Sequence, residues 1–418
     1  MLAQPVVPAT RPGSPQASAP TPMLTPLHST RRDTGSPCPP PRNAAEGGRD
    51  ASPSPGSSSR LASPQGLEAR PAHGAAPTRR RGPDFDEELA ARRKPHLLSY
   101  LRRLESRMAD RTERPVTGDT NEDMYHLDDL MQALNAADPS LQLRRYAFEF
   151  DRQCTGLAQS GLVSQLLQGM QNQAQWNAIF DRDGKHRSAV SIRCAEHAAS
   201  FVVVDSLAAD SITEKAHTDI WQRVLGQLQW FLDRKRNFAE PCVQLRAHVV
   251  FTHAQKSGEG CTIFALSAAR KMASATAIAD LHQQALAPRP PDSRAEPEVK
   301  FLAASVLPPA FMKHATSASV LRDYLEKRRQ GPVALEPGHG AVNKRGETLL
   351  ERHAAYAVTR PKAPAPEPTW MTPILKCLGL DTGPNMVTYS DSYAHKRIEF
   401  VRLALAHFAP PATGSSPQ

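Results

Sequence analysis

Residues 243–272 read Val243-Gln-Leu-Arg-Ala-His-Val-Val-Phe-Thr-His-Ala-Gln-Lys-Ser-Gly-Glu-Gly-Cys261-Thr-Ile-Phe-Ala-Leu-Ser-Ala-Ala-Arg-Lys-Met272. The stretch begins as an apolar strand, passes through a polar turn and continues as an apolar run typical of a helix. A thiol therefore stands at a helix start, where unpaired N–H groups and the helix dipole favour the nucleophilic thiolate. The stretch predicts a strand, a turn and a helix that present a reactive cysteine.

Candidate partners for this thiol lie upstream in the chain. His186 follows the turn sequence Asp181-Arg-Asp-Gly184, and Asp205 follows the apolar run Ser200-Phe-Val-Val-Val204. Asp205 comes nineteen residues after His186, which leaves room for two strands and a turn. Adjacent strand ends are therefore expected to bring the carboxylate to the imidazole.

An acyl-transfer site built on cysteine needs a thiol, a base, a group that orients the base, and donors for the oxyanion. The sequence offers Cys261 as the thiol, His186 as the base and Asp205 as the orienting group. Gln255, six residues before the cysteine, is the candidate side-chain donor, joined by backbone N–H groups near Cys261. Spacing alone leaves alternatives open, because a cysteine before an apolar helix is more often a core residue. Further histidines also lie near the same strands, at His197, His248 and His253.

The pattern along the chain predicts an α+β fold. Strands are expected over 176–180, 189–193, 200–204, 243–251 and 301–306. Helices are expected over 85–108, 121–137, 211–236, from 261 to about 280, within 342–353, and over 319–328 and 393–408. The Pro-rich stretch 287–292 is expected to be a surface loop.

Composition separates the ends of the chain from the middle. Of 418 residues, 38 are proline, and residues 1–82 are rich in Pro, Ser, Ala, Arg and Gly with little apolar periodicity. Such a segment cannot bury enough apolar surface to offset its ordering entropy, so we expect it to be disordered, like the tail 409–418. No apolar run is long enough to span a membrane, no secretory signal is present at the start, and Leu2 replaces the glycine that myristoylation needs.

Cysteine spacing and charge limit the classes of function. The six cysteines are widely separated and form no CxxC pair, which argues against a zinc site or a disulfide framework. The net charge of +9 favours an anionic partner without choosing between nucleic acid, phosphoinositide and membrane.

Several blocks in order resemble the YopJ family of bacterial type III effectors, over roughly residues 85–405. The first is Gly184-Lys-His186 with Asp205, and the second is residues 255–272 around Cys261. Three C-terminal blocks follow: Leu307-Pro-Pro-Ala-Phe-Met-Lys-His314, Val342-Asn-Lys-Arg-Gly-Glu-Thr-Leu-Leu-Glu-Arg-His353 and Ser392-Tyr-Ala-His-Lys-Arg397.

The resemblance implies a cysteine-protease-like fold of the ubiquitin-like-protease and adenain clan, used for acetyl transfer with a helical regulatory region. Acetyl-CoA would acylate Cys261, and a Ser, Thr or Lys side chain of a host signalling or immune protein would take the acetyl group. His186 would be the general base, Asp205 its partner and Gln255 the oxyanion donor. It further implies a secretion region at 1–82 and an acetyltransferase domain at 83–408, with a catalytic core at about 140–285 and regulatory elements at about 85–137 and 300–408. Type III secretion would deliver the protein into the host cell, with no nucleic-acid partner.

Members of this family resemble one another in requiring inositol hexakisphosphate as an allosteric activator. A polyphosphate needs several cationic donors from different elements. The candidates are Lys313, His314, Lys344, Arg345, Arg352, Lys396 and Arg397, together with Arg102 or Arg103. Each taken singly is more often a solvated surface charge, and Lys344 is alternatively the lysine that such enzymes autoacetylate.

Two residues beside the nucleophile depart from the family pattern. Gly260 stands where relatives often have Asp, and Thr262 replaces a common Gly. Two other readings follow from the same residues. One is a cysteine protease that cleaves ubiquitin-like conjugates with the same triad, because the two chemistries differ only in what resolves the thioester. The other is a degenerate effector that only binds host proteins.

Overall fold

The structure is a computed structural model whose described residues all belong to one compact unit, His73–Gln418. It describes residues 82–110, 118–149, 156–182, 184, 186–207, 211–235, 242–255, 260–288, 296–330, 346–361 and 386–411. The predictions of disorder for 1–82 and for the tail 409–418 thus fall almost wholly outside the described residues.

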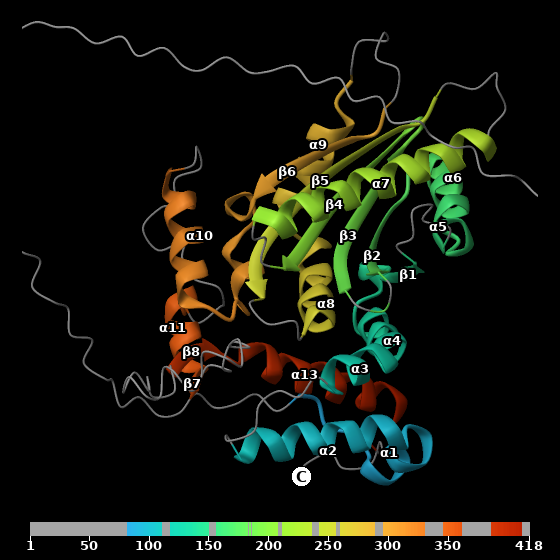
Figure 1. Ribbon diagram of the computed structural model, residues 1–418. Helices are drawn as coiled ribbons and strands as arrows, with labels where there is room; N and C mark the ends of the chain where they lie inside the picture. Colours follow the sequence, from blue (N-terminus) through green and yellow to red (C-terminus); the bar gives the residue numbers. More distant parts are fainter. Residues whose placement is uncertain are drawn as a thin grey trace, which may run out of the picture. The chain divides into compact units, whose positions relative to one another are not determined.

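A six-stranded mixed sheet forms the centre of the described unit and confirms the α+β expectation (Figure 1). Its strands are β1 (Arg144–Phe148), β2 (Gln175–Arg182), β3 (His186–Ala195), β4 (Ala198–Leu207), β5 (Gln244–Gln255) and β6 (Glu298–Ala303). They lie side by side in chain order. Strands β2, β3 and β4 pair antiparallel, whereas β1 pairs parallel to β2, and β4, β5 and β6 are mutually parallel.

Helices cover both faces of this sheet. One face packs on α8 (Cys261–Met272) and α9 (Thr276–Leu286), and the other on α6 (Leu162–Asn172) and α7 (Ser211–Lys235). Because successive strand residues point to opposite faces, Val202 belongs to the first core and Val203 to the second. A strand buried on both faces reads as a continuous apolar run, which is why β4 carries no polar alternation.

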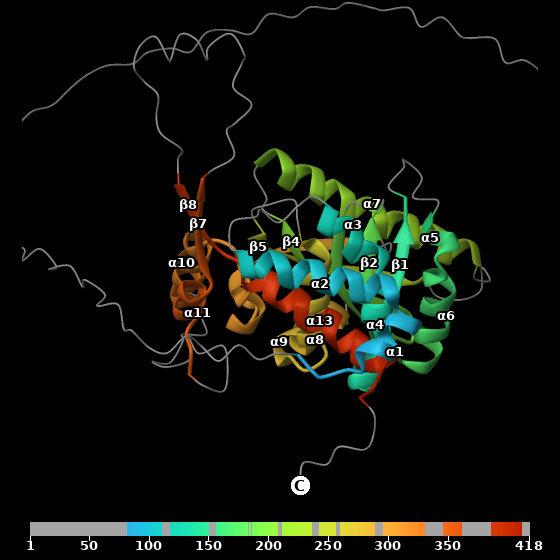
Figure 2. The same cartoon turned by 90° about the horizontal axis from the view of Figure 1, so that it is seen from below.

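A further set of helices packs beyond α8. These are α1 (Glu87–Arg93), α2 (Pro95–Asp110), α3 (Gly118–Tyr125), α4 (Leu127–Ala137) and α13 (Ser392–Phe408). Helix α13 packs against α4 and α2 and also touches α8, and Figure 2 shows it running beside α2. The first and last described segments are joined by a bond from the Asp86 amide to the Ala409 carbonyl, 3.0 Å long. Elements from both ends of the unit thus form one helical layer next to α8, which begins at Cys261.

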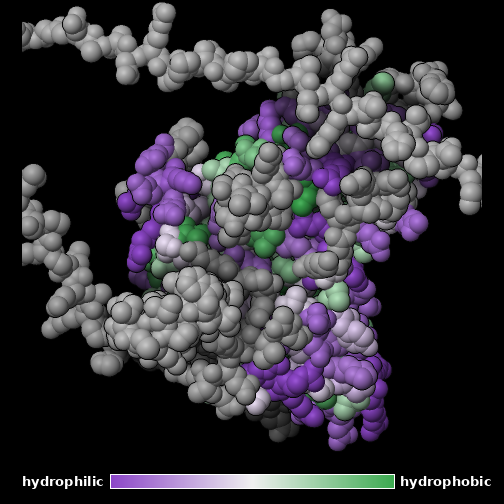
Figure 3. Space-filling model, in the orientation of Figure 1, coloured by the Kyte–Doolittle hydropathy of each residue, from purple (hydrophilic) through white to green (hydrophobic). Residues whose placement is uncertain are grey.

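The remaining elements either contact β1, as α5 does, or follow β6 in the chain. They are α5 (Gly156–Gln159), α10 (Ala318–Gln330), α11 (Leu349–Ala355) and an antiparallel pair, β7 (Ala357–Pro361) and β8 (Met386–Ser390). Three short 3-10 segments cover Pro139–Leu141, Ala304–Val306 and Pro309–Met312. Hydrophilic side chains dominate the surface over α1, α2 and α10 in Figure 3. No helix in the described ranges has the length and apolar character of a membrane span.

The structure differs from the sequence-based expectations at several boundaries. Strand β5 continues to Gln255, so the segment expected as a turn begins later. The helix expected over 121–137 is two helices that meet at His126, and the run from Cys261 is divided into α8 and α9. Strand β1, helices α5 and α6, and the pair β7 and β8 were not predicted.

Candidate active site and cation pocket

Three elements bring the predicted catalytic residues together. Strand β3 begins at His186, β4 ends just after Asp205, and α8 begins at Cys261. The Nε2 atom of His186 lies 3.0 Å from Oδ1 and 2.9 Å from Oδ2 of Asp205. The hairpin of β3 and β4 produces this contact, because antiparallel pairing places the start of one strand beside the end of the other.

Asp205 is held by several donors besides the imidazole. Its side chain is fully buried, and it accepts bonds from the Ser188 hydroxyl (2.8 Å) and the Leu207 amide (2.9 Å). Burial acts against the charged carboxylate, but His186 and these donors outweigh it and lower the pKa of Asp205. Asp205 is therefore a fixed negative charge that orients the His186 ring.

Cys261 occupies the first position of α8 and is 1% exposed. Burial alone would raise the pKa of the thiol, but the hydrogen bond and charge of His186, followed by Arg187, lower it. Burial likewise acts against imidazolium, but the charge of Asp205 raises the pKa of His186 to about 9. Because Nε2 faces Asp205, the bond with Cys261 falls to Nδ1. Each shift therefore favours the charged form, the thiolate of Cys261 and the imidazolium of His186.

Gln255 ends β5 beside this site. A register shift separates the pairs Asp205 with Phe251 and Leu207 with Gln255, so β5 carries extra residues there. Such bulges re-aim side chains next to active sites. The side chain of Gln255 is 1% exposed, and its Oε1 accepts a bond of 2.9 Å from the Ser206 hydroxyl. This bond anchors the side-chain amide through its oxygen, whereas the NH2 group is the part of the amide that can donate.

The residues on either side of Cys261 explain the departures from the family pattern. Gly260 has φ +95, a left-handed conformation that favours glycine, and it packs under the ring of Tyr393. The Tyr393 ring in turn stacks on Phe264, with ring centroids 5.8 Å apart. Thr262 is fully buried in the first turn of α8. An aromatic pair, Phe264 of α8 and Tyr393 of α13, therefore fills the space next to Gly260.

A second site lies at the other end of α8. A pocket of about 520 Å³ is lined by side chains from α8, α13 and the Pro309–Met312 turn. They are Ser267, Arg270, Lys271, Ser274, Ala275, Pro308, Ala310, Phe311, Lys313, Lys396 and Glu399. Sequence reasoning missed Arg270 and Lys271, although both stand in the last turn of the quoted helix.

Positive charge accumulates in this pocket, with Glu399 as the carboxylate among its lining residues. Burial, and then repulsion from Lys313, Lys396 and Arg352, hold the pKa of Lys271 well below its ordinary value. Burial also lowers the pKa of Lys396 to about 8, although Glu399 opposes the shift. Ammonium groups that depress one another in this way are suited to bind a polyanion.

The other predicted phosphate ligands have varied positions. Arg352 lies near the pocket, where it pairs with Glu347 (3.2 Å) and donates to the Lys313 carbonyl (3.3 Å). His314 is 3% exposed and its Nδ1 lies 3.3 Å from the Ser392 hydroxyl, inside the protein. Lys344 and Arg345 lie outside the described residues. In the first helical region, the exposed Arg102 pairs with Glu87 and Arg103 with Glu122.

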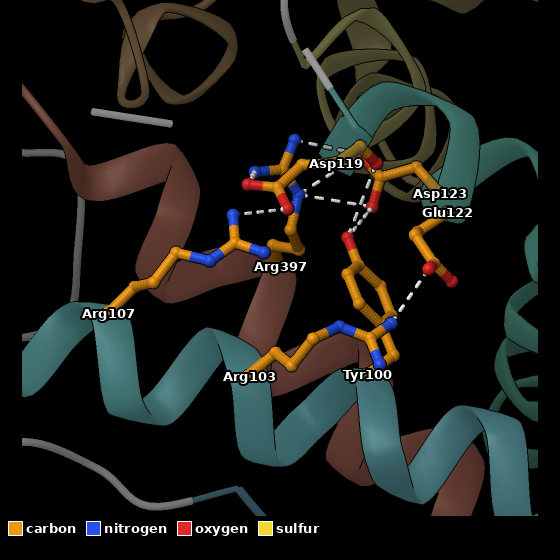
Figure 4. Close-up of polar contacts among 7 residues, drawn as sticks. All are labelled: Tyr100, Arg103, Arg107, Asp119, Glu122, Asp123 and Arg397. Carbon is orange, nitrogen blue, oxygen red and sulfur yellow. Dashed lines mark hydrogen bonds and ion pairs between the residues drawn. The ribbon is translucent and has the colours of Figure 1, made fainter. Parts of the chain in front are cut away.

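Arg397 has a different environment from its neighbour Lys396. It is 1% exposed, and its Nε and Nη2 donate to the Asp123 carboxylate at 2.8–3.0 Å. Figure 4 shows Asp119 and Asp123 on either side of its guanidinium, with the Tyr100 hydroxyl donating to Asp123 and Arg107 paired to Asp119. Its donors therefore join α13 to α3, Tyr100 and Arg107 connect α2 to the same carboxylates, and we leave Arg397 out of the phosphate site.

Comparisons with known proteins show the family of this chain. The family model described as YopJ Serine/Threonine acetyltransferase matches residues 97–403. A solved structure of AvrA delL154 with IP6 and CoA is similar at TM-score 0.50 and 21% identity, covering 77% of this chain and 99% of that one. HopZ1a in complex with IP6 and CoA follows at TM-score 0.49 and 19% identity, covering 76% and 95%. A comparison with curated protein sequences gave no significant match.

Proposed function

Because the chain belongs to the YopJ serine/threonine acetyltransferase family, we propose that it moves an acetyl group from acetyl-CoA through Cys261 to Ser, Thr or Lys side chains of host proteins. The observation that carries this assignment of residues is the contact of His186 with Asp205 beside the buried thiol of Cys261. The roles of general base, orienting group and nucleophile follow from that arrangement.

The first half of the reaction acylates the enzyme. The Cys261 thiolate attacks the carbonyl carbon of acetyl-CoA, a new carbon–sulfur bond forms, and the bond to the CoA sulfur breaks. His186 gives its proton to the departing CoA thiolate. The amide of Gln255 and the backbone N–H groups at the start of α8 are the donors for the oxyanion that develops on the carbonyl.

The second half transfers the acetyl group onward. His186, now neutral, takes the proton of the substrate hydroxyl or amine as its oxygen or nitrogen attacks the thioester. The bond to the Cys261 sulfur breaks, and the thiolate and imidazolium are restored. Asp205 stays ionised in both halves and holds the ring in one tautomer, with its donors Ser188 and Leu207 keeping the carboxylate in place.

The cation pocket is the proposed site of inositol hexakisphosphate. Its volume lies within the range of about 300–1,000 Å³ that small ligands fill, and its mutually repelling cations suit a polyphosphate. We assign Arg270, Lys271, Lys313 and Lys396 to the ligand, with Arg352 beside them. The pocket and Cys261 lie at opposite ends of α8, so a ligand that orders the last turn of this helix also supports the turn that carries the nucleophile.

The proposal also covers the fold clan of the domain and its route of delivery. The strand and helix order around Cys261 supports a cysteine-protease-like fold of the ubiquitin-like-protease and adenain clan. Residues 83–408 form the acetyltransferase domain, with a catalytic core at about 140–285, and residues 1–82 serve type III secretion into the host cell. Deleting 1–82 should stop delivery into host cells and leave acetyl transfer by purified protein intact. If the truncated protein is delivered as well as the full chain, residues 1–82 do not serve secretion.

Labelled acetyl-CoA tests the central assignment. Purified protein incubated with inositol hexakisphosphate should acquire label, and protein without it should acquire much less. Cys261→Ala should acquire none while keeping the circular dichroism spectrum of the wild type. If Cys261→Ala acquires as much label as the wild type, Cys261 is not the nucleophile. If no protein acquires label and the wild type hydrolyses a ubiquitin-like conjugate, the protease alternative is favoured.

A further inference from the structure

Arg187 directly follows the catalytic histidine and is buried against the nucleophile. It is the second residue of β3 and 1% exposed. Its Nη2 donates to the Gly184 carbonyl at 2.6 Å, and its Nε faces Oδ1 of Asp181 at 3.0 Å as an ion pair. The remaining nitrogen, Nη1, points to the Sγ atom of Cys261 at 3.8 Å. Two anchors thus fix a guanidinium with one donor directed at sulfur.

The charge of Arg187 is not cancelled by its carboxylate partner. Asp181 also pairs with Arg145, whose Nη2 and Nε lie 2.6 and 3.2 Å from Oδ2. One carboxylate therefore serves two guanidinium groups, although Arg145 has a second, more exposed partner in Asp128 at 3.0 Å. A buried cation needs compensating negative charge, and the thiolate of Cys261 is the group placed to supply it.

We propose that Arg187 acts as a second cation on the nucleophile and holds the Cys261 sulfur as a thiolate independently of the charge on His186. This inference rests on the proposed role of Cys261. Its chemical consequence concerns the two halves of the reaction. His186 can surrender its proton to the CoA thiolate while Arg187 remains charged, and a stabilised thiolate is the better leaving group when the substrate attacks the thioester. Arg187 therefore favours the release step, at some loss of nucleophilicity in the attack.

The ultraviolet absorbance of the thiolate as a function of pH tests this role without acetyl-CoA. Each protein is compared with the same protein carrying Cys261→Ala, so that only this sulfur contributes. Arg187→Gln should move the midpoint upward by about one pH unit, the lower end of the effect of an opposite charge within about 4–6 Å. Arg145→Gln is the matched control, because it removes a cation from the same Asp181 without touching sulfur. It should shift the midpoint much less.

The same titration in a His186→Ala background separates the two cations. Adding Arg187→Gln to that background should raise the midpoint again, whereas a purely structural Arg187 would add no shift. Superimposed profiles for wild type and folded Arg187→Gln would overturn the proposal. If circular dichroism shows that Arg187→Gln does not fold, the thiolate titration is carried out on Arg187→Lys instead. Its shorter side chain cannot keep the Asp181 and Gly184 contacts and still reach sulfur, so an intermediate midpoint is expected and an unchanged one refutes the role. Loss of acetyl transfer alone would bear on the proposed function, not on this titration.

Discussion

Tyr393 lies so close to Gly260 that a Cβ atom added to the glycine would be 3.1 Å from Cδ2 of the ring. The residue before Cys261 thus has two separate reasons to be glycine, its φ of +95 and this contact. Helix α13, from the end of the chain, thereby packs directly on the turn that positions Cys261.

Gly260→Ala should lower the free energy of unfolding by about 2 kcal/mol, from backbone strain and the contact together. Gly161→Ala is the matched control, because Gly161 has φ +77 but no atom within 4 Å of an added Cβ. Urea denaturation of the two variants measures the difference. Equal losses of unfolding free energy in the two variants would mean that the Tyr393 ring moves aside and that its contact with residue 260 has no effect on stability.

Activity should depend on pH through His186. Its pKa of about 9 means that the imidazolium that protonates CoA is present below that pH and lost above it, so the rate should fall as the pH rises through about 9. Asp205→Asn removes the main cause of the raised pKa and should move this fall to lower pH, with a loss of roughly a hundredfold or more in kcat/KM. If the activity of Asp205→Asn falls over the same alkaline pH range as that of the wild type, a group other than His186 causes the fall.

Lys271→Met should have opposite effects on the free and the liganded protein. Removing one of several repelling cations should raise the melting temperature without ligand, corresponding to about 0.5–2 kcal/mol. The stabilisation that inositol hexakisphosphate gives to the wild type should be much reduced. Lys300→Met on β6, with a half-exposed ammonium, is the control and should change neither value. A Lys271→Met protein stabilised by ligand as strongly as wild type would contradict the pocket assignment.

Affinity for the polyphosphate should weaken as the pH rises through about 8. Lys396, with a pKa of about 8, is protonated below that pH and ready to bind phosphate. Above it the side chain is a neutral amine that must first take up a proton, so binding should be coupled to proton uptake. Titration calorimetry at pH 8 in two buffers of different ionisation enthalpy measures that uptake, and identical heats in both would exclude it.

Arg397→Met should be strongly destabilising because it leaves the buried carboxylate of Asp123 without its cation and removes one of the two cations that pair with Asp119. The expected loss is about 3–5 kcal/mol. Arg103→Gln, which breaks the exposed pair with Glu122, should cost less than about 1 kcal/mol. Adding Asp123→Asn to Arg397→Met should recover part of the loss, and an additive double variant would show that the two residues are not coupled.

Local sequence predicted that His186, Asp205 and Cys261 stand at the ends of strands or at the start of a helix. The choice of His186 among several histidines, and of Cys261 over a core cysteine, rested on the resemblance to a family and not on local pattern. Strand β1 was not predicted because its five residues begin with two arginines, which leaves an apolar run of only Tyr146, Ala147 and Phe148. Its place is decided by pairing with β2, which no local pattern reveals.

The cation pocket was only half predictable for a different reason. Its cations come from α8, α13 and the turn before α10, which are far apart in sequence. Lys396 and Arg397 are adjacent, yet one lines the pocket and the other is buried against Asp123. Which of two neighbouring cations faces a ligand depends on the rotation of α13 about its axis, and that rotation is set by packing on α2, α4 and α8.

The near-complete burial of Cys261 also governs its fate under oxidation. A thiolate is the form that peroxide converts to sulfenic acid and then, irreversibly in most enzymes, to sulfinic and sulfonic acids. With 1% of Cys261 exposed, an oxidant reaches this sulfur slowly even though His186 and Arg187 lower the pKa of the thiol. On the proposed function, any movement that admits acetyl-CoA to Cys261 also begins its exposure to oxidative inactivation.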